Sequence, residues 1–289
     1  MSDGERETVV ITGASTGIGY ATTGLLAERG YEVVATVRRA EDATRLQEEF
    51  GANVHPMLMD VTDPAAIRAM AQATAELVGE RGVSGLINNA GITVTGPLMH
   101  LPSEELRRQF DVNVFGVMDV TQALLPLMGS DFQLPYPPGR IINVSSVSGH
   151  IVYPFLAPYA ASKHALEALS DGLRRELMLY GIDVVLMVFG SVRTPIWDKL
   201  DEAAVDQYLE TDFGPSVEKL LATRVQAGRE GMPAGRAAAA ILKALETPKP
   251  NARYVVVNNT WQGWLVPRLL PTRLFDGAIS KQLGLEPPK

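Results

Sequence analysis

The chain has 289 residues, no cysteine and a formal net charge of −7, with 46% hydrophobic and 20% charged residues. This composition excludes disordered, collagen-like and disulfide-stapled chains, as well as thiolate metal centres and a nucleophilic cysteine. The acidic balance gives no general attraction to nucleic acid, so no nucleic-acid partner is expected. The N-terminus lacks the pattern of a secretion signal, and the longest apolar run, 184–189, is too short to cross a bilayer. We therefore expect a cytoplasmic protein with no integral membrane segment.

Seven short runs rich in β-branched residues alternate with helix-length amphipathic or alanine-rich segments. They lie at residues 8–12, 31–37, 54–59, 85–88, 140–145, 182–189 and 253–257. Each run is nearly continuous in apolar residues, as in strands covered on both faces, and the connections are long enough for crossover helices. The pattern predicts an α/β protein of the Rossmann type, with one doubly wound parallel sheet of about seven strands and helices on both faces.

Two segments depart from this alternation. Residues 190–232 interrupt the alternation of strands and helices before the last strand. Residues 258–289 form an apolar C-terminal extension. No linker or repeat divides the chain. We expect a single domain over 1–289, with 190–232 as a small cap over the substrate.

A glycine-rich turn, TGASTGIG at residues 12–19, follows the first predicted strand and precedes a helical stretch. Glycines let the backbone turn sharply and approach a pyrophosphate, which the N–H groups at the helix start can bind. A purely structural strand-to-helix turn is the alternative interpretation. The place of the turn after the first strand favours a dinucleotide site formed by Gly13, Ser15, Thr16, Gly17, Ile18 and Gly19.

Tyr159 and Lys163 are four residues apart, so on a helix their side chains share one face. That face continues with Leu166, Leu173 and Leu177, which suits burial. Because burial of an unpaired ammonium is costly, the pattern favours a functional role. A nearby ammonium would lower the tyrosine pKa from its free value of about 10, so we expect Tyr159 to act as acid or base and Lys163 to tune it.

Four motifs together resemble the short-chain dehydrogenase/reductase family, over roughly residues 7–257. They are TGxxxGIG at 12–19, NNAG at 88–91, the serine pair at 145–146 and YxxxK at 159–163. The resemblance implies that Ser146 binds the substrate oxygen and Tyr159 transfers the proton. It implies that Lys163 also binds the nicotinamide ribose.

The resemblance also gives a role to Asn113, which falls on an apolar helical stripe with Leu106, Phe110 and Val117. It implies that Asn113 holds a water near Lys163 as part of a proton relay. A buried, locally satisfied amide is the alternative. The four histidines are too scattered to suggest a metal pair, and no metal site is expected.

Further cofactor contacts are implied by the same resemblance. Asp60 and Val61 correspond to the adenine contact, and Val192 and Thr194 to the residues around the nicotinamide amide, although Phe189 replaces the proline common in the family before that loop. The NNAG motif contributes Asn89, Ala90 and Gly91.

Arg38 stands at the end of the second predicted strand, where the ribose of a dinucleotide should lie. An acid that would favour NAD is absent, since that position is Val37. A guanidinium can bind a phosphate with two hydrogen bonds, so we expect NADP(H) to be preferred, with NAD(H) also usable. A solvated arginine at a strand end is the alternative.

The substrate is expected to be small and lipophilic, because residues 147–158 carry few of the polar groups that a sugar site needs. Val147, Tyr153 and Leu156 are the expected contacts. More apolar residues lie in the cap and the C-terminal extension, although the latter can instead pack on the core or a partner subunit: Ile196, Trp197, Leu200, Tyr208, Leu209, Trp261, Trp264, Leu265, Leu269, Leu270 and Phe275. The stretch from Ser145 through Leu177 most resembles the 17β-hydroxysteroid and retinol dehydrogenase-like branch.

These observations predict an NADP(H)-dependent oxidoreductase that interconverts a secondary alcohol and a ketone on a steroid-, retinoid- or long-chain-like substrate. A 3-oxoacyl-thioester reductase is one alternative, although only scattered arginines are available to bind an acyl carrier. A dinucleotide-sensing binding protein without turnover is the other, and the presence of both Tyr159 and Lys163 speaks against it. The resemblance further implies a homodimer or homotetramer.

Overall fold

A computed structural model describes residues 7–194 and 205–287. Its central feature is one parallel sheet in the order β3-β2-β1-β4-β5-β6-β9. The strands are β1 (Thr8–Ile11), β2 (Glu32–Val37), β3 (Val54–Leu58), β4 (Gly85–Asn88), β5 (Arg140–Ser146), β6 (Asp183–Phe189) and β9 (Arg253–Val256). All seven predicted strands are confirmed, and their boundaries shift by at most one residue.

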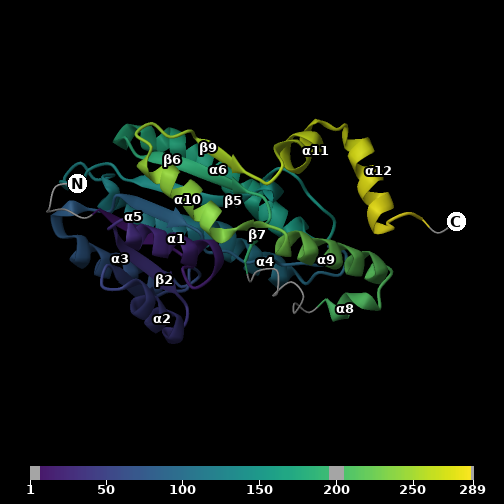
Figure 1. Cartoon of the computed structure of the whole chain (residues 1–289), viewed down its shortest axis with the longest axis horizontal. Coiled ribbons are helices and arrows are strands. Elements are labelled where there is room, and N and C mark those ends of the chain that lie inside the picture. The colour runs from purple at the N-terminus through teal and green to yellow at the C-terminus, as the bar shows by residue number, and fades with distance from the viewer. Residues whose placement is uncertain (1–6, 195–204, 288–289) are drawn as a thin grey trace.

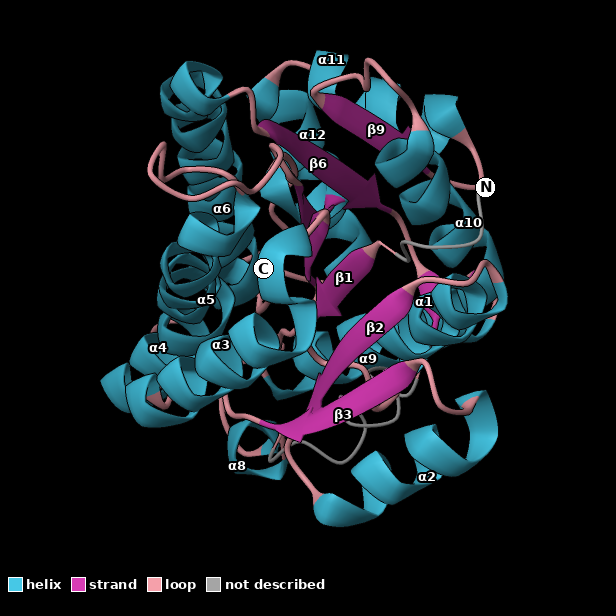
Figure 2. Ribbon diagram, turned by 90° about the vertical axis from the view of Figure 1, so that its left-hand side faces the viewer, coloured by secondary structure: helices cyan, strands magenta, loops and turns pink. Residues whose placement is uncertain are grey.

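Helices cover both faces of this sheet, as Figure 2 shows. On one face lie α1 (Gly17–Glu28), α2 (Ala40–Phe50) and α10 (Ala234–Glu246), and on the other lie α3 (Pro64–Val78), α5 (Gly116–Leu124) and α6 (Ala157–Glu176). Shorter turns of helix occur at Gly79–Arg81, Leu125–Met128, Val147–Gly149 and Leu177–Tyr180. The Rossmann-type architecture is therefore confirmed.

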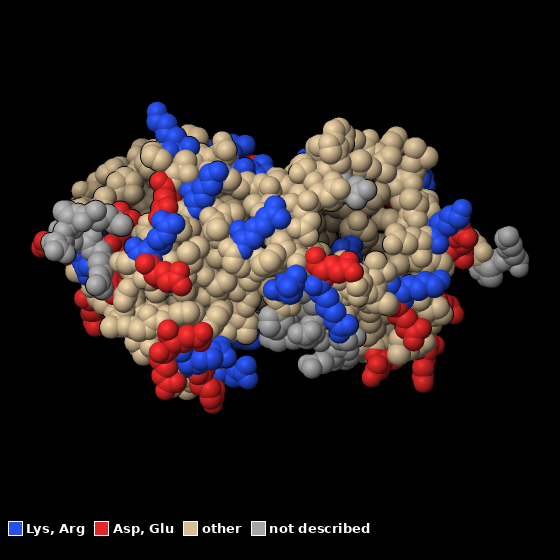
Figure 3. All heavy atoms as spheres, in the orientation of Figure 1, with Lys and Arg blue, Asp and Glu red and all other residues tan. Residues whose placement is uncertain are grey.

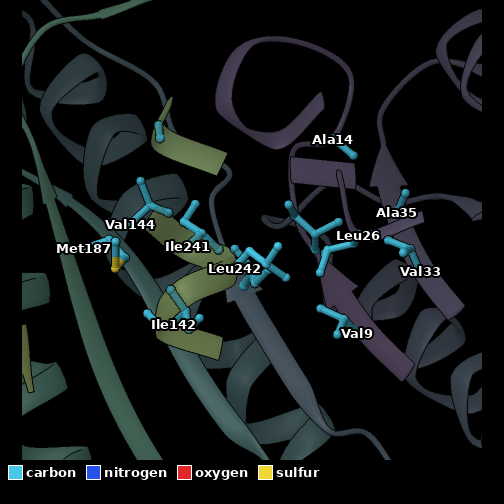
Figure 4. Packing of buried hydrophobic residues seen from close by; sticks show 14 of the residues in the cluster. Val9, Ala14, Leu26, Val33, Ala35, Ile142, Val144, Met187, Ile241 and Leu242 are labelled. Atoms are coloured by element: carbon cyan, nitrogen blue, oxygen red, sulfur yellow. The ribbon is translucent and has the colours of Figure 1, made fainter. Parts of the chain in front are cut away.

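The core is divided between the two faces of the sheet. Val9 packs with Leu26 of α1 and Ile241 of α10 in one cluster, shown in Figure 4, whereas its neighbour Val10 belongs to the opposite cluster with Ile67 of α3. Alternate residues of a strand point to opposite faces, so strands covered on both sides must be apolar throughout. Each such fully buried side chain contributes about 1.5–3 kcal/mol to folding.

The sheet changes direction at β1, and this positions the site. Strand β1 pairs with β2 on one side and with β4 on the other, so the connections leave in opposite directions. A crevice forms at the carboxyl ends of the strands at such a switch point. The glycine turn after β1, the NNAG motif after β4 and Ser146 at the end of β5 all lie along this edge.

A smaller lobe stands at the end of the molecule that carries the C-terminus (Figure 1). It contains α8 (Asp206–Leu209), α9 (Gly214–Arg229), α11 (Val266–Leu269), α12 (Thr272–Leu283), the two-stranded pair β7 (Val192–Arg193) and β8 (Met232–Pro233), and a π-helical turn at Trp261–Leu265. Val217 and Leu220 of α9 pack with Ile279 and Leu283 of α12. The surface is hollowed where this lobe meets the body of the molecule (Figure 3).

Part of the C-terminal extension packs on this chain. Packing on the core is one of the two alternatives to a role in substrate binding, and packing on a partner subunit is the other. Trp264 is 7% exposed and contacts Val188 of β6, whereas Trp261 is 68% exposed. Among the described residues, no helix combines the length and the apolar character needed to span a bilayer.

Candidate active site

A cavity of about 530 Å³ lies at the carboxyl edge of the sheet and brings most of the predicted site residues together. It is lined by all the expected cofactor residues except Gly19, by three of the four expected catalytic residues, and by two of the three expected substrate contacts. These lining residues are Gly13, Ser15, Thr16, Gly17, Ile18, Arg38, Asp60, Val61, Asn89, Ala90, Gly91, Val192, Thr194, Ser146, Tyr159, Lys163, Val147 and Leu156. Gly19, Asn113 and Tyr153 lie outside the lining.

The glycine turn is packed so tightly that side chains would disrupt it. Gly13 and Gly17 have φ angles of 68° and 61°, in the left-handed region that favours glycine. A Cβ on Gly13 would lie 2.8 Å from the Cα of Ala90, and one on Gly19 would overlap the carbonyl oxygen of Gly13. Gly19 thus supports the turn from beneath, which explains its place outside the cavity.

The NNAG motif fixes the other side of this turn. The side-chain amide of Asn89 donates to the carbonyl oxygens of Thr12 and Gly13, at 2.9 and 3.0 Å. The hydroxyl of Thr12 accepts hydrogen bonds from the backbone N–H groups of Asn89 and Ala90, both at 3.0 Å. In this structure Asn89 therefore shapes the cavity wall by holding the glycine turn in place.

The residues present fit a dinucleotide at the start of α1. No side chain caps the N-terminus of this helix and its first turn carries no acidic residue, so the first backbone N–H groups remain for an anion. Gly13, Ser15, Thr16 and Gly17 of the turn before this helix line the cavity. A pyrophosphate suits this combination of exposed donors and close backbone approach.

Arg38 lines the cavity at the end of β2, and it differs from its arginine neighbours in having no acidic partner. Arg39 and Arg45 both pair with Asp42, at 3.4 and 3.0 Å, whereas Arg38 forms no ion pair with the residues that the structure describes. Burial raises the pKa of Asp60, but hydrogen bonds from Thr62 and the charge of Arg38 outweigh it, so the pKa lies below its ordinary value. The guanidinium of Arg38 remains available to a phosphate.

The catalytic side chains converge from β5 and α6. The hydroxyls of Ser146 and Tyr159 share a hydrogen bond, and the Oγ of Ser146 also accepts from the backbone N–H of Ser148 at 3.1 Å. The Nζ of Lys163 lies 5.8 Å from the centre of the Tyr159 ring. A phenol, a hydroxyl and an ammonium thus face one small volume, as the four-residue spacing of the tyrosine and lysine predicts.

The pKa of Tyr159 is raised in this structure, whereas the spacing with Lys163 predicts that it is lowered. Burial raises the pKa of Tyr159, opposed only by the hydrogen bond with Ser146. The ammonium of Lys163 donates to the carbonyl oxygen of Val144 at 2.8 Å, with its Nζ 5.8 Å from the centre of the Tyr159 ring. Burial lowers the pKa of Lys163 to about 8, against the opposing charge of Glu167.

Asn113 is buried and satisfied by its neighbours. Helix α4 (Ser103–Phe110) runs into α5 through a π turn at Asp111–Phe115, and this turn contains Asn113. Its Oδ1 accepts from the N–H of Ile92 at 2.9 Å, while its Nδ2 donates to the carbonyl of Ile92 at 3.0 Å and to Ser162 at 3.2 Å. Leu106, expected on the same buried stripe, is 38% exposed because the wider turn shifts the helical phase.

Glu167 is a site residue that the sequence analysis missed. It is 5% exposed, lies one helical turn beyond Lys163, and contacts Arg253 at 2.8 Å and His150 at 3.4 Å. Its spacing from Lys163 equals that between Tyr159 and Lys163, so the helical period could have revealed it. The buried ammonium therefore has a nearby carboxylate as well as a carbonyl partner.

The substrate side of the cavity is lined by Val147 and Leu156 but not by Tyr153. The Tyr153 ring lies under the guanidinium of Arg224, at 3.8 Å, and meets Phe275 of α12 edge-on. Tyr208 is buried inside the lobe. Ile196, Trp197 and Leu200 lie outside the described residues, and no described residue beyond 258 lines the cavity.

The loop that carries these contacts is anchored at Phe155, which has the unusual φ of 66° for a bulky residue. Its carbonyl accepts from the N–H of Gly96 at 2.9 Å, and its ring packs against Phe213 with centroids 5.8 Å apart. These contacts offset the cost of a left-handed residue, of order 1–2 kcal/mol. They leave the next residue, Leu156, on the cavity wall.

Comparison with known proteins decides the family. The family model described as short chain dehydrogenase matches residues 7–204. The chain belongs to this family. The resemblance drawn from its motifs is confirmed, and this short-chain dehydrogenase is an NAD(P)-dependent oxidoreductase.

Two relatives match this protein over nearly the whole length of the chain. It is 38% identical to the NADPH-dependent 3-dehydrocapnine reductase of Ornithobacterium rhinotracheale, over 95% of this chain and 96% of that protein. It is 30% identical to mouse retinol dehydrogenase 5, over 94% of this chain and 87% of that protein.

Solved structures agree with the fold. A short-chain dehydrogenase from Streptomyces avermitilis matches with a TM-score of 0.74 and 28% identity, over 96% of this chain and 95% of that one. A short-chain dehydrogenase/reductase from Burkholderia phymatum in complex with NAD matches with a TM-score of 0.74 and 27% identity, over 88% of this chain and 90% of that one.

Proposed function

We propose that this short-chain dehydrogenase interconverts a secondary alcohol and a ketone with NADP(H) on a lipophilic substrate. The hydrogen-bonded pair Ser146 and Tyr159 carries the proposal, because it lies beside Lys163 in the same cavity as the glycine turn. When bound, the nicotinamide supplies or accepts the hydride. The protein then has to orient the substrate oxygen and move one proton.

In the reductive direction, the hydroxyls of Ser146 and Tyr159 donate hydrogen bonds to the carbonyl oxygen and polarise it. Tyr159 is protonated at neutral pH, since burial raises its pKa, and it gives its proton to that oxygen. The ammonium of Lys163, held on the same side by Val144, stabilises the phenolate that forms. We also propose the family's relay through a water beside Lys163; because the side chain of Asn113 is bonded to Ile92 and Ser162, its part in this relay falls to its backbone. In the oxidative direction Tyr159 takes the proton from the hydroxyl of the alcohol, and Ser146 again binds that oxygen.

The preference for NADP(H) is supported by Arg38 and by the absence of an acid at Val37. A 2′-phosphate beside Arg38 would gain charge-assisted hydrogen bonds, whereas NAD offers only a hydroxyl there. The relative that reduces 3-dehydrocapnine is named as NADPH-dependent, which agrees with this preference. Asp60, Val61, Val192 and Thr194 complete the cofactor wall.

The lipophilic character of the substrate is supported by apolar residues in the wall of the cavity. Val147, Leu156 and Phe189 contribute apolar side chains to this wall, alongside polar ones such as Ser148 and Arg224. The similarity to retinol dehydrogenase 5 agrees with an apolar substrate. We propose that α9 and its surroundings, within 190–232, serve as the cap, and that the enzyme is a homodimer or homotetramer.

One panel of substrates tests this function against its alternatives. NADPH consumption is followed with steroids, retinoids, long-chain ketones, 3-oxoacyl thioesters and sugars, with wild type and the Tyr159→Phe variant side by side. We expect lipophilic ketones to give the highest kcat/KM. Faster turnover of thioesters or sugars would contradict the substrate class, and NADPH binding without turnover of any substrate would favour a sensing protein.

A further inference from the structure

Arg224 places a positive charge in the active-site cavity from the cap side. It lies on α9, is partly buried, and its side chain lines the same cavity as Tyr159 and Lys163. Its guanidinium stacks on the ring of Tyr153 at 3.8 Å and hydrogen-bonds with the Tyr153 side chain. Neither contact neutralises its charge.

The other arginine on the substrate half of the cavity is differently placed. Arg108 is paired with Glu105 through two hydrogen bonds, whereas no carboxylate in residues 7–194 or 205–287 lies within ion-pair distance of Arg224. A guanidinium has five N–H donors, and the single hydroxyl of Tyr153 can accept only part of them. Arg224 itself belongs to the cavity lining.

The position of Arg224 points to the substrate rather than the adenosine part of the cofactor. Tyr153 and Leu156 belong to the loop between Ser146 and Tyr159, which follows β5. Arg38 marks the adenosine end of the cavity, after β2. Strands β1 and β4 lie between β2 and β5 in the sheet. Arg224 therefore lies on the side of the cavity where the substrate enters.

A partly buried cation that has no carboxylate partner among the described residues is unfavourable. Burial indeed lowers the pKa of Arg224, opposed by Tyr153. An anion in the cavity would remove this penalty, and the planar fork of a guanidinium matches an oxyanion with two parallel hydrogen bonds. Val147 and Leu156 beside it suit a carbon chain.

We propose that Arg224 binds an oxyanion carried by the substrate, so that the enzyme acts on an amphiphile with a carboxylate, phosphate or sulfonate group as well as a lipophilic part. This inference rests on the proposed function, because it assigns the charged end of that same substrate. The ring of Tyr153, 3.8 Å away, holds the guanidinium in place.

Matched substrates test the proposal. Wild type is assayed with NADPH on a long-chain oxo acid and on its methyl ester, which differ only in the charge. We expect kcat/KM to be about 10- to 100-fold higher for the acid, the range of hydrogen bonds to charged groups. The variant Arg224→Gln should lose this preference while it still reduces the ester, and Arg224→Lys should retain part of it.

Two controls make the result specific. Arg229→Gln, on the exposed surface of the same helix, should leave the acid preference unchanged. The Kd of NADPH should be the same in wild type and Arg224→Gln. A preference for the acid that survives in Arg224→Gln would overturn the proposal, and so would a loss of NADPH affinity with the preference intact.

A binding measurement separates this proposal from the proposed function. Octanoate, octyl phosphate, octanesulfonate and octan-1-ol are titrated into the enzyme saturated with NADP⁺, and no turnover is required. We expect the anions to bind about 10- to 100-fold more tightly than the alcohol, and this difference to vanish in Arg224→Gln. Equal binding of the anions and the alcohol to wild type overturns the anion site even if ketones are reduced. Failure of all reductase assays with selective anion binding contradicts only the proposed reaction.

Discussion

The Nζ of Lys163 donates a hydrogen bond to the carbonyl oxygen of Val144, 2.8 Å away, and so ties helix α6 to the strand that carries Ser146. Tyr159 lies in the first turn of the same helix, so the bond also helps to set the distance between the phenol and the serine hydroxyl. The arrangement places the proton-transfer groups before any ligand is bound. Such preorganisation reduces the rearrangement that the reaction would otherwise require.

Replacing Tyr159 with phenylalanine removes the proton donor while leaving the ring in place. We expect kcat to fall by about 10²- to 10⁴-fold, the usual contribution of a general acid or base, with the Kd of NADPH nearly unchanged. The control is Tyr180→Phe, because Tyr180 stacks on Phe132 at the surface beyond α6. Turnover by Tyr159→Phe within a few-fold of wild type would mean that another group transfers the proton.

Removing the guanidinium of Arg38 should change the cofactor preference. We expect Arg38→Ala to weaken NADPH binding by about 10- to 100-fold, since hydrogen bonds to charged groups are lost, and to leave NADH binding unchanged. Arg39→Ala is the matched control, because Arg39 already pairs with Asp42 and does not line the cavity. Titration of both cofactors into the three proteins measures the effect. Equal affinities of wild type for NADPH and NADH would contradict the assignment.

The sheet and the cofactor turn could be predicted from the sequence because each depends on a local pattern. Strands such as β6 are apolar on both faces, and the glycine turn is a short motif that directly follows β1, although the contact with Ala90 that requires Gly13 comes from a distant part of the chain. Tyr159 and Lys163 follow the helical period of an undistorted helix. In these cases the neighbours that decide the structure lie within a few residues or belong to a short motif.

Other features depend on contacts that no local pattern encodes. The π turn around Asn113 changes the helical period, so the side chain bonds Ile92 and Ser162 instead of facing the cavity. Arg224 acquires its environment from Tyr153, which is distant in sequence. The raised pKa of Tyr159 likewise follows from burial within the folded protein, which the tyrosine–lysine spacing does not reveal.

The buried ammonium of Lys163 should make stability depend on pH. Its pKa falls from 10.5 in the unfolded chain to about 8 in the folded one, so between these values the unfolded state binds more protons. The free energy of unfolding therefore rises with pH across this window, by up to about 3 kcal/mol for a shift from 10.5 to about 8. Below pH 8 the full penalty of the buried charge is present.

Denaturant unfolding of the cofactor-free protein measures this dependence, with Lys163→Met as the reference, because it removes the charge and keeps an apolar chain. The difference in stability between Lys163→Met and wild type should be largest below pH 8 and shrink toward pH 10.5. Other lysines and tyrosines titrate equally in both proteins, so their contributions to the difference in the free energy of unfolding cancel. A constant difference over this range would show that the ammonium is not destabilised by burial.

The carboxylate of Glu167 should control the charge of Lys163 during catalysis. Glu167 raises the pKa of Lys163 and so opposes the effect of burial. In Glu167→Gln this support is lost, and the pKa of Lys163 should fall below its value of about 8 in the free enzyme. Because the ammonium stabilises the phenolate of Tyr159, we expect kcat/KM for NADPH, which reports groups of the free enzyme, to decline at lower pH than in wild type.

The groups around Glu167 supply the control for this experiment. Arg253 contacts Glu167 at 2.8 Å and Asp171 at 3.8 Å, and His150 lies 3.4 Å from Glu167. Asp171→Asn therefore removes an acidic partner of the same arginine without removing the carboxylate that acts on Lys163. We expect its pH profile to match wild type, while the midpoint of the alkaline decline moves to lower pH only in Glu167→Gln. A common midpoint in all three proteins would show that Lys163 does not govern the decline, and equal shifts in both variants would assign it to Arg253.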